Sequence, residues 1–139
     1  MILTDTGYWI ALAGVKDKYH QQALDVSRQI DSELVITWPV MTETCHLLAN
    51  RVSPEAPAKF MQQVEQFVSI FNVDISHIQR IRVLLQQYQD LPMDLADASL
   101  VVAAEELACG DILSTDRRDF NAYRWKNHKP FRNLLFPYD

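Results

Sequence analysis

The chain has 139 residues, of which 48% are hydrophobic and 22% are charged, a composition typical of one globular domain. We therefore expect a single domain over residues 1–139. The formal net charge of −5 argues against a protein that coats nucleic acid by charge alone. No apolar run approaches the about 18 residues that a membrane span needs, so we expect no membrane association.

The two cysteines, Cys45 and Cys109, both lie in apolar segments with helical spacing. We expect buried thiols in a reducing compartment rather than a disulfide, which predicts a cytoplasmic protein. Residues 1–14 are apolar, but they lack a basic stretch and contain Asp5. They are therefore predicted to form a core strand that leads into a helix, and not a signal peptide.

Short apolar strands and amphipathic helices alternate along the chain. Strands are predicted at residues 1–4, 34–37, 70–73, 112–113 and 134–136. Helices are predicted at residues 8–12, 20–30, 40–50, 54–68, 75–88 and 95–107. Because short loops connect these elements, their order predicts an α/β domain with three layers, α/β/α, and a mainly parallel central sheet.

Acidic residues follow the first two predicted strands. Asp5 comes directly after the first strand, and Thr6 can cap the next helix, which leaves the Asp5 carboxylate available for function. Glu43 lies in the second turn of the helix that follows the second strand. A glutamate there is either solvated or directed into the same pocket as Asp5.

The segment 93–119 presents acids at both ends of one helix–strand unit. Asp94 and Asp97 are three residues apart in the first turn of the helix, so they share a face where the helix dipole favours negative charge. Asp116 follows the strand at 112–113, with Ser114 before it and Asp119 after it. Open α/β sheets bind ligands at the carboxyl ends of their strands, and these acids are predicted to lie there.

Carboxylates gathered in one place resist ionisation unless a cation neutralises them. Oxygen ligands of this kind suit Mg²⁺ or Mn²⁺, which activate water for attack on a phosphodiester. Neither cysteine is spaced with a histidine as a zinc site requires. The three glycines form no phosphate-binding loop. The pattern therefore predicts metal-dependent phosphate chemistry.

These motifs resemble those of the PIN-domain ribonucleases, and in particular the VapC-type toxins of bacterial toxin–antitoxin pairs. The matching pieces are Asp5-Thr6, Glu43, MDLADASLVVAAEEL at 93–107 and DILSTDRRDF at 111–120, and they span nearly the whole chain in motif order. The resemblance implies four metal-binding, catalytic acids, which would be Asp5, Glu43, Asp97 and Asp116. Three further residues match a hydroxyl and additional acids of the family, namely Ser114, Asp94 and Asp119. Together with Thr6 they are the predicted auxiliary residues of the site.

The resemblance further implies Mg²⁺- or Mn²⁺-dependent cleavage of RNA, a homodimer, and inhibition by a cognate antitoxin that covers the active site. Two alternatives keep the fold: a PIN nuclease of RNA processing without an antitoxin, and a non-catalytic module that binds metal or RNA. A phospho-receiver domain is disfavoured because Asp5 stands alone after the first strand. A haloacid-dehalogenase-type phosphatase is disfavoured because Gly7 stands where its second aspartate is needed.

The last quarter of the chain holds six of the 13 lysines and arginines. Candidates for binding RNA phosphates are Arg117, Arg118, Arg124 and Lys126. Tyr123, Trp125 and Phe131 are candidates for stacking on unpaired bases. The alternative is that Trp125 and Phe131 belong to the core and that the cations only keep the protein in solution.

Overall fold

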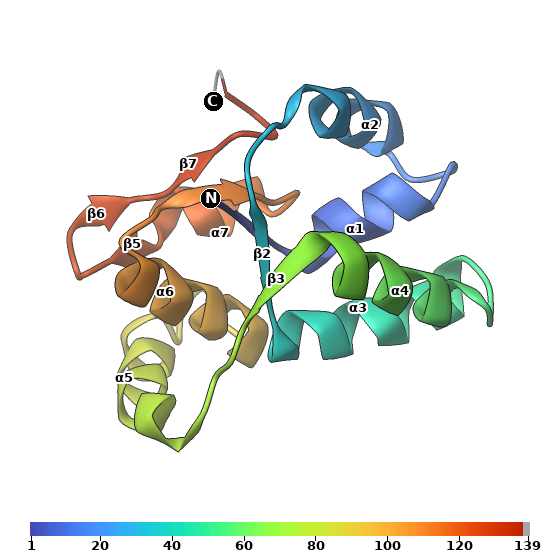
Figure 1. The fold of residues 1–139 in the computed structure, drawn as a ribbon. Helices are drawn as coiled ribbons and strands as arrows, with labels where there is room; N and C mark the ends of the chain where they lie inside the picture. The colour runs from blue at the N-terminus through green and yellow to red at the C-terminus, as the bar shows by residue number, and fades with distance from the viewer. Residues whose placement is uncertain (138–139) are drawn as a thin grey trace.

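The computed structural model describes residues 1–137, which form an open sheet flanked by helices (Figure 1). Within these residues the sheet has five parallel strands in the order β3-β2-β1-β4-β7. Its strands are β1 (Ile2–Thr4), β2 (Leu34–Thr37), β3 (Val68–Phe71), β4 (Asp111–Leu113) and β7 (Arg132–Asn133), and a separate antiparallel pair is formed by β5 (Arg124–Trp125) and β6 (Lys129–Pro130). The helices are α1 (Thr6–Ala13), α2 (His20–Gln29), α3 (Trp38–Arg51), α4 (Ala56–Phe67), the 3₁₀ helix η1 (Ile75–His77), α5 (Ile78–Gln87), α6 (Leu95–Leu107) and α7 (Arg117–Ala122). The α/β fold class with a parallel sheet is confirmed.

Strand β1 lies in the centre of the sheet, between β2 and β4. Leu3 lies opposite Val35 on one side and Ile112 on the other. Beyond the end of β1, the Asp5 amide donates a 3.0 Å hydrogen bond to the Leu113 carbonyl. Because parallel neighbours end at the same edge of the sheet, the segments that follow β1 and β4 meet there.

Helix α6 lies in the interior, and its residues from Ala96 to Ala104 are all buried. A helix that is apolar on every side needs neighbours on every side, and α6 contacts β1, β2, α3 and α5. The hydroxyls of Thr37 and Ser99 share a buried 2.7 Å hydrogen bond between the end of β2 and α6. This packing holds the first turn of α6 against the edge of the sheet where β1 and β4 end.

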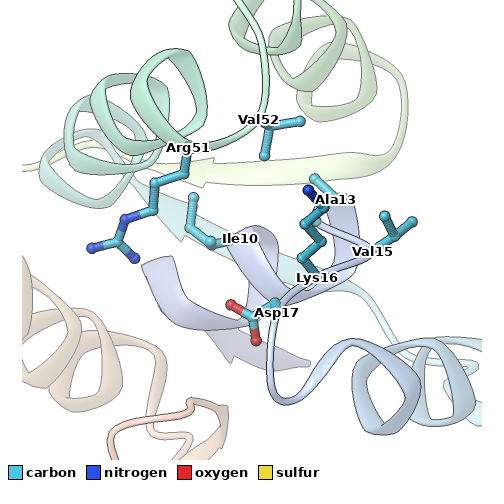
Figure 2. A pocket seen from close by; sticks show the side chains of 8 residues that line it. Ile10, Ala13, Val15, Lys16, Asp17, Arg51 and Val52 are labelled. Atoms are coloured by element: carbon cyan, nitrogen blue, oxygen red, sulfur yellow. The ribbon is translucent and has the colours of Figure 1, made fainter.

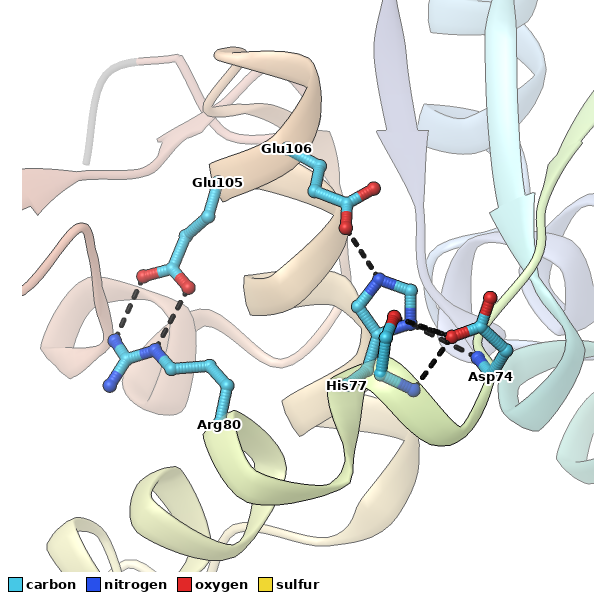
Figure 3. Close-up of polar contacts among 6 residues, drawn as sticks. Asp74, His77, Arg80, Glu105 and Glu106 are labelled. Carbon is cyan, nitrogen blue, oxygen red and sulfur yellow. Dashed lines mark hydrogen bonds and ion pairs between the residues drawn. The ribbon is translucent and has the colours of Figure 1, made fainter.

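Polar side chains hold α5 and η1 against the C-terminal half of α6 (Figure 3). Arg80 donates hydrogen bonds of 2.9 Å and 2.8 Å to the two carboxylate oxygens of Glu105. His77 donates from Nε2 to Glu106 at 2.5 Å and accepts at Nδ1 from the Asp74 amide at 3.0 Å. Helix α6 is therefore fixed along its length, from the sheet edge to its last turn.

Two predicted strands differ from the structure. The third begins at Val68 rather than at residue 70, because α4 ends at Phe67 and the chain becomes extended at once. The strand predicted at residues 134–136 is wrong: β7 is Arg132–Asn133, and a turn follows it in which Leu135 and Phe136 are buried. Their apolar character reflects core packing and not pairing in the sheet. The helix predicted at residues 75–88 is divided into η1 and α5, and the other predicted elements are confirmed with ends that differ by at most two residues.

Cys45 and Cys109 are free thiols, as predicted, although each is half-buried rather than fully buried. Within residues 1–137, no helix is both long and apolar enough to cross a membrane.

Candidate active site

The Asp5 carboxylate is held by both of its oxygens at the end of β1. Oδ1 accepts from the Thr6 amide at 2.8 Å, and Oδ2 accepts from the Ser114 hydroxyl at 2.8 Å. Asp5 is therefore the N-cap of α1, and the prediction that Thr6 caps this helix is wrong. The extended backbone of Asp5 directly precedes Thr6, which is already helical, so the cap position falls on the aspartate. The Thr6 hydroxyl is buried and has no hydrogen-bond partner within the described residues.

The two acids of α6 occupy different positions in its first turn. Asp94 is the N-cap, and its Oδ1 accepts from the Asp97 amide at 2.8 Å. Asp97 is helical and buried, and its Oδ2 accepts from the Tyr123 hydroxyl at 2.9 Å. This leaves the other Asp97 oxygen without a hydrogen bond in the described part of the chain.

Ser114 connects the acids that follow β1 and β4. It is fully buried, donates to Asp5, and accepts a 3.0 Å hydrogen bond from the Asp116 amide. Asp116 caps α7 and accepts from the Asp119 amide at 3.4 Å. Asp97, Asp116 and Asp119 each offer one carboxylate oxygen, and these oxygens lie within 4.8 Å of one another.

The acidic side chains described above line one cavity of about 390 Å³. Glu43 reaches it from α3 and is half-buried. Of the eight predicted metal-binding and auxiliary residues, only Ser114 is not among the lining residues, which include Asp5, Thr6, Glu43, Asp94, Asp97, Asp116 and Asp119. The structure therefore brings together acids that are separated by more than 100 residues in the sequence.

Burial and mutual repulsion disfavour ionisation of the carboxyl groups. Burial raises the pKa of Asp5 to about 7, and the charge of Asp116 adds to this. Burial also raises the pKa of Asp97 to about 8, with further contributions from the charges of Asp5 and Asp94. The pKa of Asp116 rises to about 6 through burial and then through the hydrogen bond and charge of Asp119. A cation in this cavity would relieve the repulsion and favour the ionised forms.

The lining residues fit a divalent cation that prefers oxygen. The close group of Asp97, Asp116 and Asp119 supplies three carboxylates, and Asp5 and Glu43 line the same cavity without joining that group. Carboxylates without nitrogen or sulfur ligands are typical of Mg²⁺ or Mn²⁺ sites.

Comparison with known proteins decides the family, because residues 2–126 match the PIN domain. This chain belongs to the PIN-domain family. It is 32% identical over 103 residues to Ribonuclease VapC26 of Mycobacterium tuberculosis, covering 71% of this chain and 76% of that protein. The crystal structure of Mycobacterium tuberculosis VapC20, described as a sarcin–ricin loop cleaving toxin, matches with a TM-score of 0.77 and 19% identity, over 84% of this chain and 90% of that chain. The resemblance to VapC-type PIN ribonucleases is confirmed.

Tyr123 contacts an acid of the cavity, which the sequence did not reveal. Predicted as a stacking residue for RNA bases, it is fully buried and donates to Asp97. Trp125 and Phe131 are 7% and 9% exposed, so the core alternative is correct for both. Tyr123 follows the last residue of α7 in an extended conformation, and its ring packs against that of Phe120.

None of the four predicted RNA-binding cations is among the residues that line the acidic cavity. The Arg117 guanidinium lies over the Phe136 ring, 4.3 Å from its centre. Arg118 donates to Asp119 at 3.1 Å, and Arg124 donates to the backbone carbonyls of residues 121–123. The Lys126 ammonium lies 5.8 Å from the centre of the Trp125 ring. A role of these residues in RNA binding stays a prediction.

The cavity is also lined by residues that no motif indicated, namely Asp17, Lys18, Tyr19 and Arg51. They come from the loop after α1 and from the last residue of α3. Only the packing of α1 beside α3 brings them to the site, so the sequence offered no signal for them.

Proposed function

We propose that this PIN-domain ribonuclease cuts RNA internally with the help of Mg²⁺ or Mn²⁺, and that it is the toxin half of a toxin–antitoxin pair. The observation that carries the proposal is the cavity at the end of β1 and β4, in which buried carboxyl groups have raised pKa values. Ionised carboxylates gathered and buried in one cavity destabilise the folded protein unless a cation neutralises them. The name of the relative that is 32% identical, Ribonuclease VapC26, supports RNA as the substrate.

Asp5, Glu43, Asp97 and Asp116 would hold the metal, with Asp119 close to Asp97 and Asp116. When bound, a divalent cation lowers the pKa of water and screens the charge of a phosphodiester. The hydrogen bonds from Ser114 to Asp5 and from Tyr123 to Asp97 fix one oxygen of each carboxylate. Each carboxylate is thereby oriented before a substrate arrives, because its rotation is restricted.

Cleavage of a structured RNA pool by the purified protein tests the activity. The reactions would contain Mg²⁺, Mn²⁺ or EDTA, and Asp97→Asn would be assayed beside the wild type. Asp31→Asn is a matched control, because Asp31 is exposed and lies outside the acidic cavity. We expect metal-dependent cutting by the wild type and by the control, and a loss of at least about 100-fold for Asp97→Asn. Equal cutting by Asp97→Asn would disprove the assignment of this residue. Metal binding without any cutting would favour a binding module.

The antitoxin is expected to cover the acidic cavity. An open reading frame next to the gene, encoding a small protein with a DNA-binding N-terminus, is the candidate to express. Its product should form a complex with the wild type and abolish cleavage. A complex that still cuts RNA at the rate of the isolated protein would contradict inhibition at the active site. The alternative of an RNA-processing nuclease predicts no such neighbouring protein.

A homodimer is supported by an apolar groove beside the acidic cavity. The groove of about 610 Å³ is lined by Trp38, Leu95 and Val73, and it shares Glu43 and Asp94 with the acidic cavity. Trp38 is 48% exposed and Leu95 is 53% exposed, which is unusual for large apolar side chains that face water together. We propose that a second copy covers them. Trp38→Ala should then shift the mass measured by sedimentation from a dimer towards a monomer, and an unchanged dimer would exclude this face.

A further inference from the structure

A second cavity, of about 380 Å³, adjoins the acidic cavity and shares Ile10, Asp17 and Arg51 with it. It lies between α1, the loop after α1 and the C-terminal end of α3 (Figure 2). A third cavity, of about 260 Å³, shares Ala13 and Val52 with the second. The three cavities therefore adjoin one another in a row that leads away from the carboxylates, and we call this row the groove.

Arg51 stands where the acidic cavity passes into this groove. It is the last residue of α3, and it is exposed. In Figure 2 its side chain extends from the helix past Ile10, with the guanidinium directed away from Val52. Within residues 1–137 this guanidinium makes neither a hydrogen bond nor an ion pair.

The lack of an acidic partner distinguishes Arg51 from three other arginines, and Arg82 and Arg124 share this lack within residues 1–137. Arg80, Arg118 and Arg132 each form an ion pair with a carboxylate at 3.1 Å or less. Arg51 lines a cavity that also holds seven carboxyl side chains, and it pairs with none of them. Its charge is therefore available to an anion that enters the groove.

An RNA strand that approaches the acidic cavity meets more acidic than basic side chains. The carboxylates that line it are Asp5, Asp17, Glu43, Asp94, Asp97, Asp116 and Asp119. Among the described lining residues only Lys18 and Arg51 are basic, and Lys16 lines the second cavity. Cations at the edge of such a site offset the repulsion of phosphates that do not contact the metal. Arginine is well suited to this task because its guanidinium binds two phosphate oxygens at once.

We infer that Arg51 binds a backbone phosphate of the substrate RNA next to the phosphate that is cut, and that the strand continues along the groove past Lys16. This inference rests on the proposed ribonuclease function. Arg51 thereby positions the strand, while the carboxylates act on the neighbouring phosphate.

The first test is the salt dependence of RNA binding. Arg51→Gln and Arg51→Lys would be made in the Asp97→Asn protein, and binding of a labelled single-stranded RNA would be measured from 50 to about 300 mM salt. Loss of one phosphate contact should reduce the slope of log K against log salt by about 0.7 for Arg51→Gln. Arg51→Lys should retain the slope. Arg82→Gln is the matched control, because Arg82 is an exposed arginine of α5, and α5 lies across the molecule from the end of α3 (Figure 1).

Kinetics on the otherwise unchanged protein give a second readout. Arg51→Gln should raise KM about 10-fold with little change in kcat, which is the result expected when binding to one phosphate is lost. Replacing single phosphates near the mapped cut with neutral methylphosphonates should identify the partner. At one position the replacement should weaken binding by the wild type but not by Arg51→Gln, because both changes remove the same contact.

The outcomes separate this inference from the proposed function. If the wild type and Arg82→Gln neither bind nor cut RNA, the proposed function fails. If both cut RNA, and Arg51→Gln has their slope and their KM, the assignment of Arg51 is overturned. It is overturned as well if Arg51→Gln keeps normal RNA binding and loses only inhibition by the antitoxin, because the groove then serves a protein partner.

Discussion

The Tyr123 hydroxyl donates a 2.9 Å hydrogen bond to Oδ2 of Asp97, and it is buried behind the acidic cavity. Burial, followed by the charge of Asp97, raises the pKa of Tyr123 far above its usual value. The Tyr123 hydroxyl therefore keeps its proton at neutral pH and can donate a hydrogen bond. The same hydrogen bond lowers the pKa of Asp97 and opposes the effect of its burial. Tyr123 thus both orients this carboxylate and favours its ionised form.

Tyr123→Phe should weaken Mn²⁺ binding by about 10-fold, because residues that orient a metal ligand contribute on this scale. Without the hydroxyl, Asp97 loses one fixed oxygen and holds its proton more tightly. Calorimetric titration with Mn²⁺ at pH 7 measures the effect. Tyr88→Phe is the control, because the Tyr88 hydroxyl accepts from the Arg124 amide and contacts no acid of the site. Equal affinities in the wild type and Tyr123→Phe would show that the hydrogen bond is only structural.

Ser114→Ala should reduce both stability and cleavage. The hydroxyl donates to Asp5 and accepts from the Asp116 amide, so its loss leaves a buried carboxylate oxygen and a backbone amide without these partners. The expected loss in the free energy of unfolding is about 1–3 kcal/mol, measured by urea denaturation in EDTA. Ser27→Ala removes a hydroxyl that, within residues 1–137, bonds only to the Leu24 carbonyl on α2, and it should retain full cleavage. A Ser114→Ala protein with wild-type stability would mean that Asp5 and Asp116 are held by other contacts.

Gly7→Ala should destabilise the start of α1, because an added Cβ would overlap the Thr115 side chain at its Oγ1 atom. The segment between β4 and α7 packs directly against the first turn of α1, and both contribute to the cavity. We expect a loss of about 1–3 kcal/mol, which is typical of overpacking. Thr115→Ala in the same protein should restore part of it, and the double-mutant cycle measures this coupling. If the stability losses of the two single variants simply add in the double variant, the loss in Gly7→Ala does not come from contact with Thr115.

Much of the fold could be predicted because strand and helix signals are local. The apolar run at residues 2–4 and the helical spacing of residues 95–107 each indicate their element without reference to the rest of the chain. The misplaced last strand shows the limit of this approach. Leu135 and Phe136 are apolar because they are buried, and burial alone does not distinguish a strand from a turn.

Most acids that line the cavity could be predicted because they stand at strand ends and helix starts, where the topology brings them together. The supporting residues could not. Tyr123 and Arg51 reach the site from the C-terminal ends of α7 and α3. The residues next to them in the sequence do not indicate that Tyr123 contacts a carboxylate or that Arg51 lines a cavity. The N-cap of α1 is the residue before the first helical residue. Because α1 begins at Thr6 and not later, the N-cap is Asp5, one position before the predicted one.

The raised pKa values of the acidic cavity predict how stability depends on pH when no metal is bound. Asp5, Asp97 and Asp116 have an ordinary pKa of 3.8, which we take for the unfolded chain, and folding raises these values to about 7, 8 and 6. Below about pH 4 the groups are protonated in both states. Between pH 4 and 8 the folded protein holds protons that the unfolded chain has released, so its stability falls as the pH rises through this window.

In EDTA, the melting temperature should therefore fall between pH 6 and pH 8, and Asp97→Asn should reduce this fall. At pH 8 this variant should melt about 5 °C above the wild type in EDTA, because it avoids burying the charge. Mn²⁺ should raise the melting temperature of the wild type more at pH 8 than at pH 6, since fewer protons then compete for the carboxylates. Mn²⁺ should raise the melting temperature of Asp97→Asn far less than that of the wild type. Scanning calorimetry of both proteins at the two pH values, with and without metal, provides the measurement. A wild type whose stability in EDTA does not change over this range would mean that these carboxyl groups ionise normally in the folded protein, and the cavity would then have no electrostatic need for a cation.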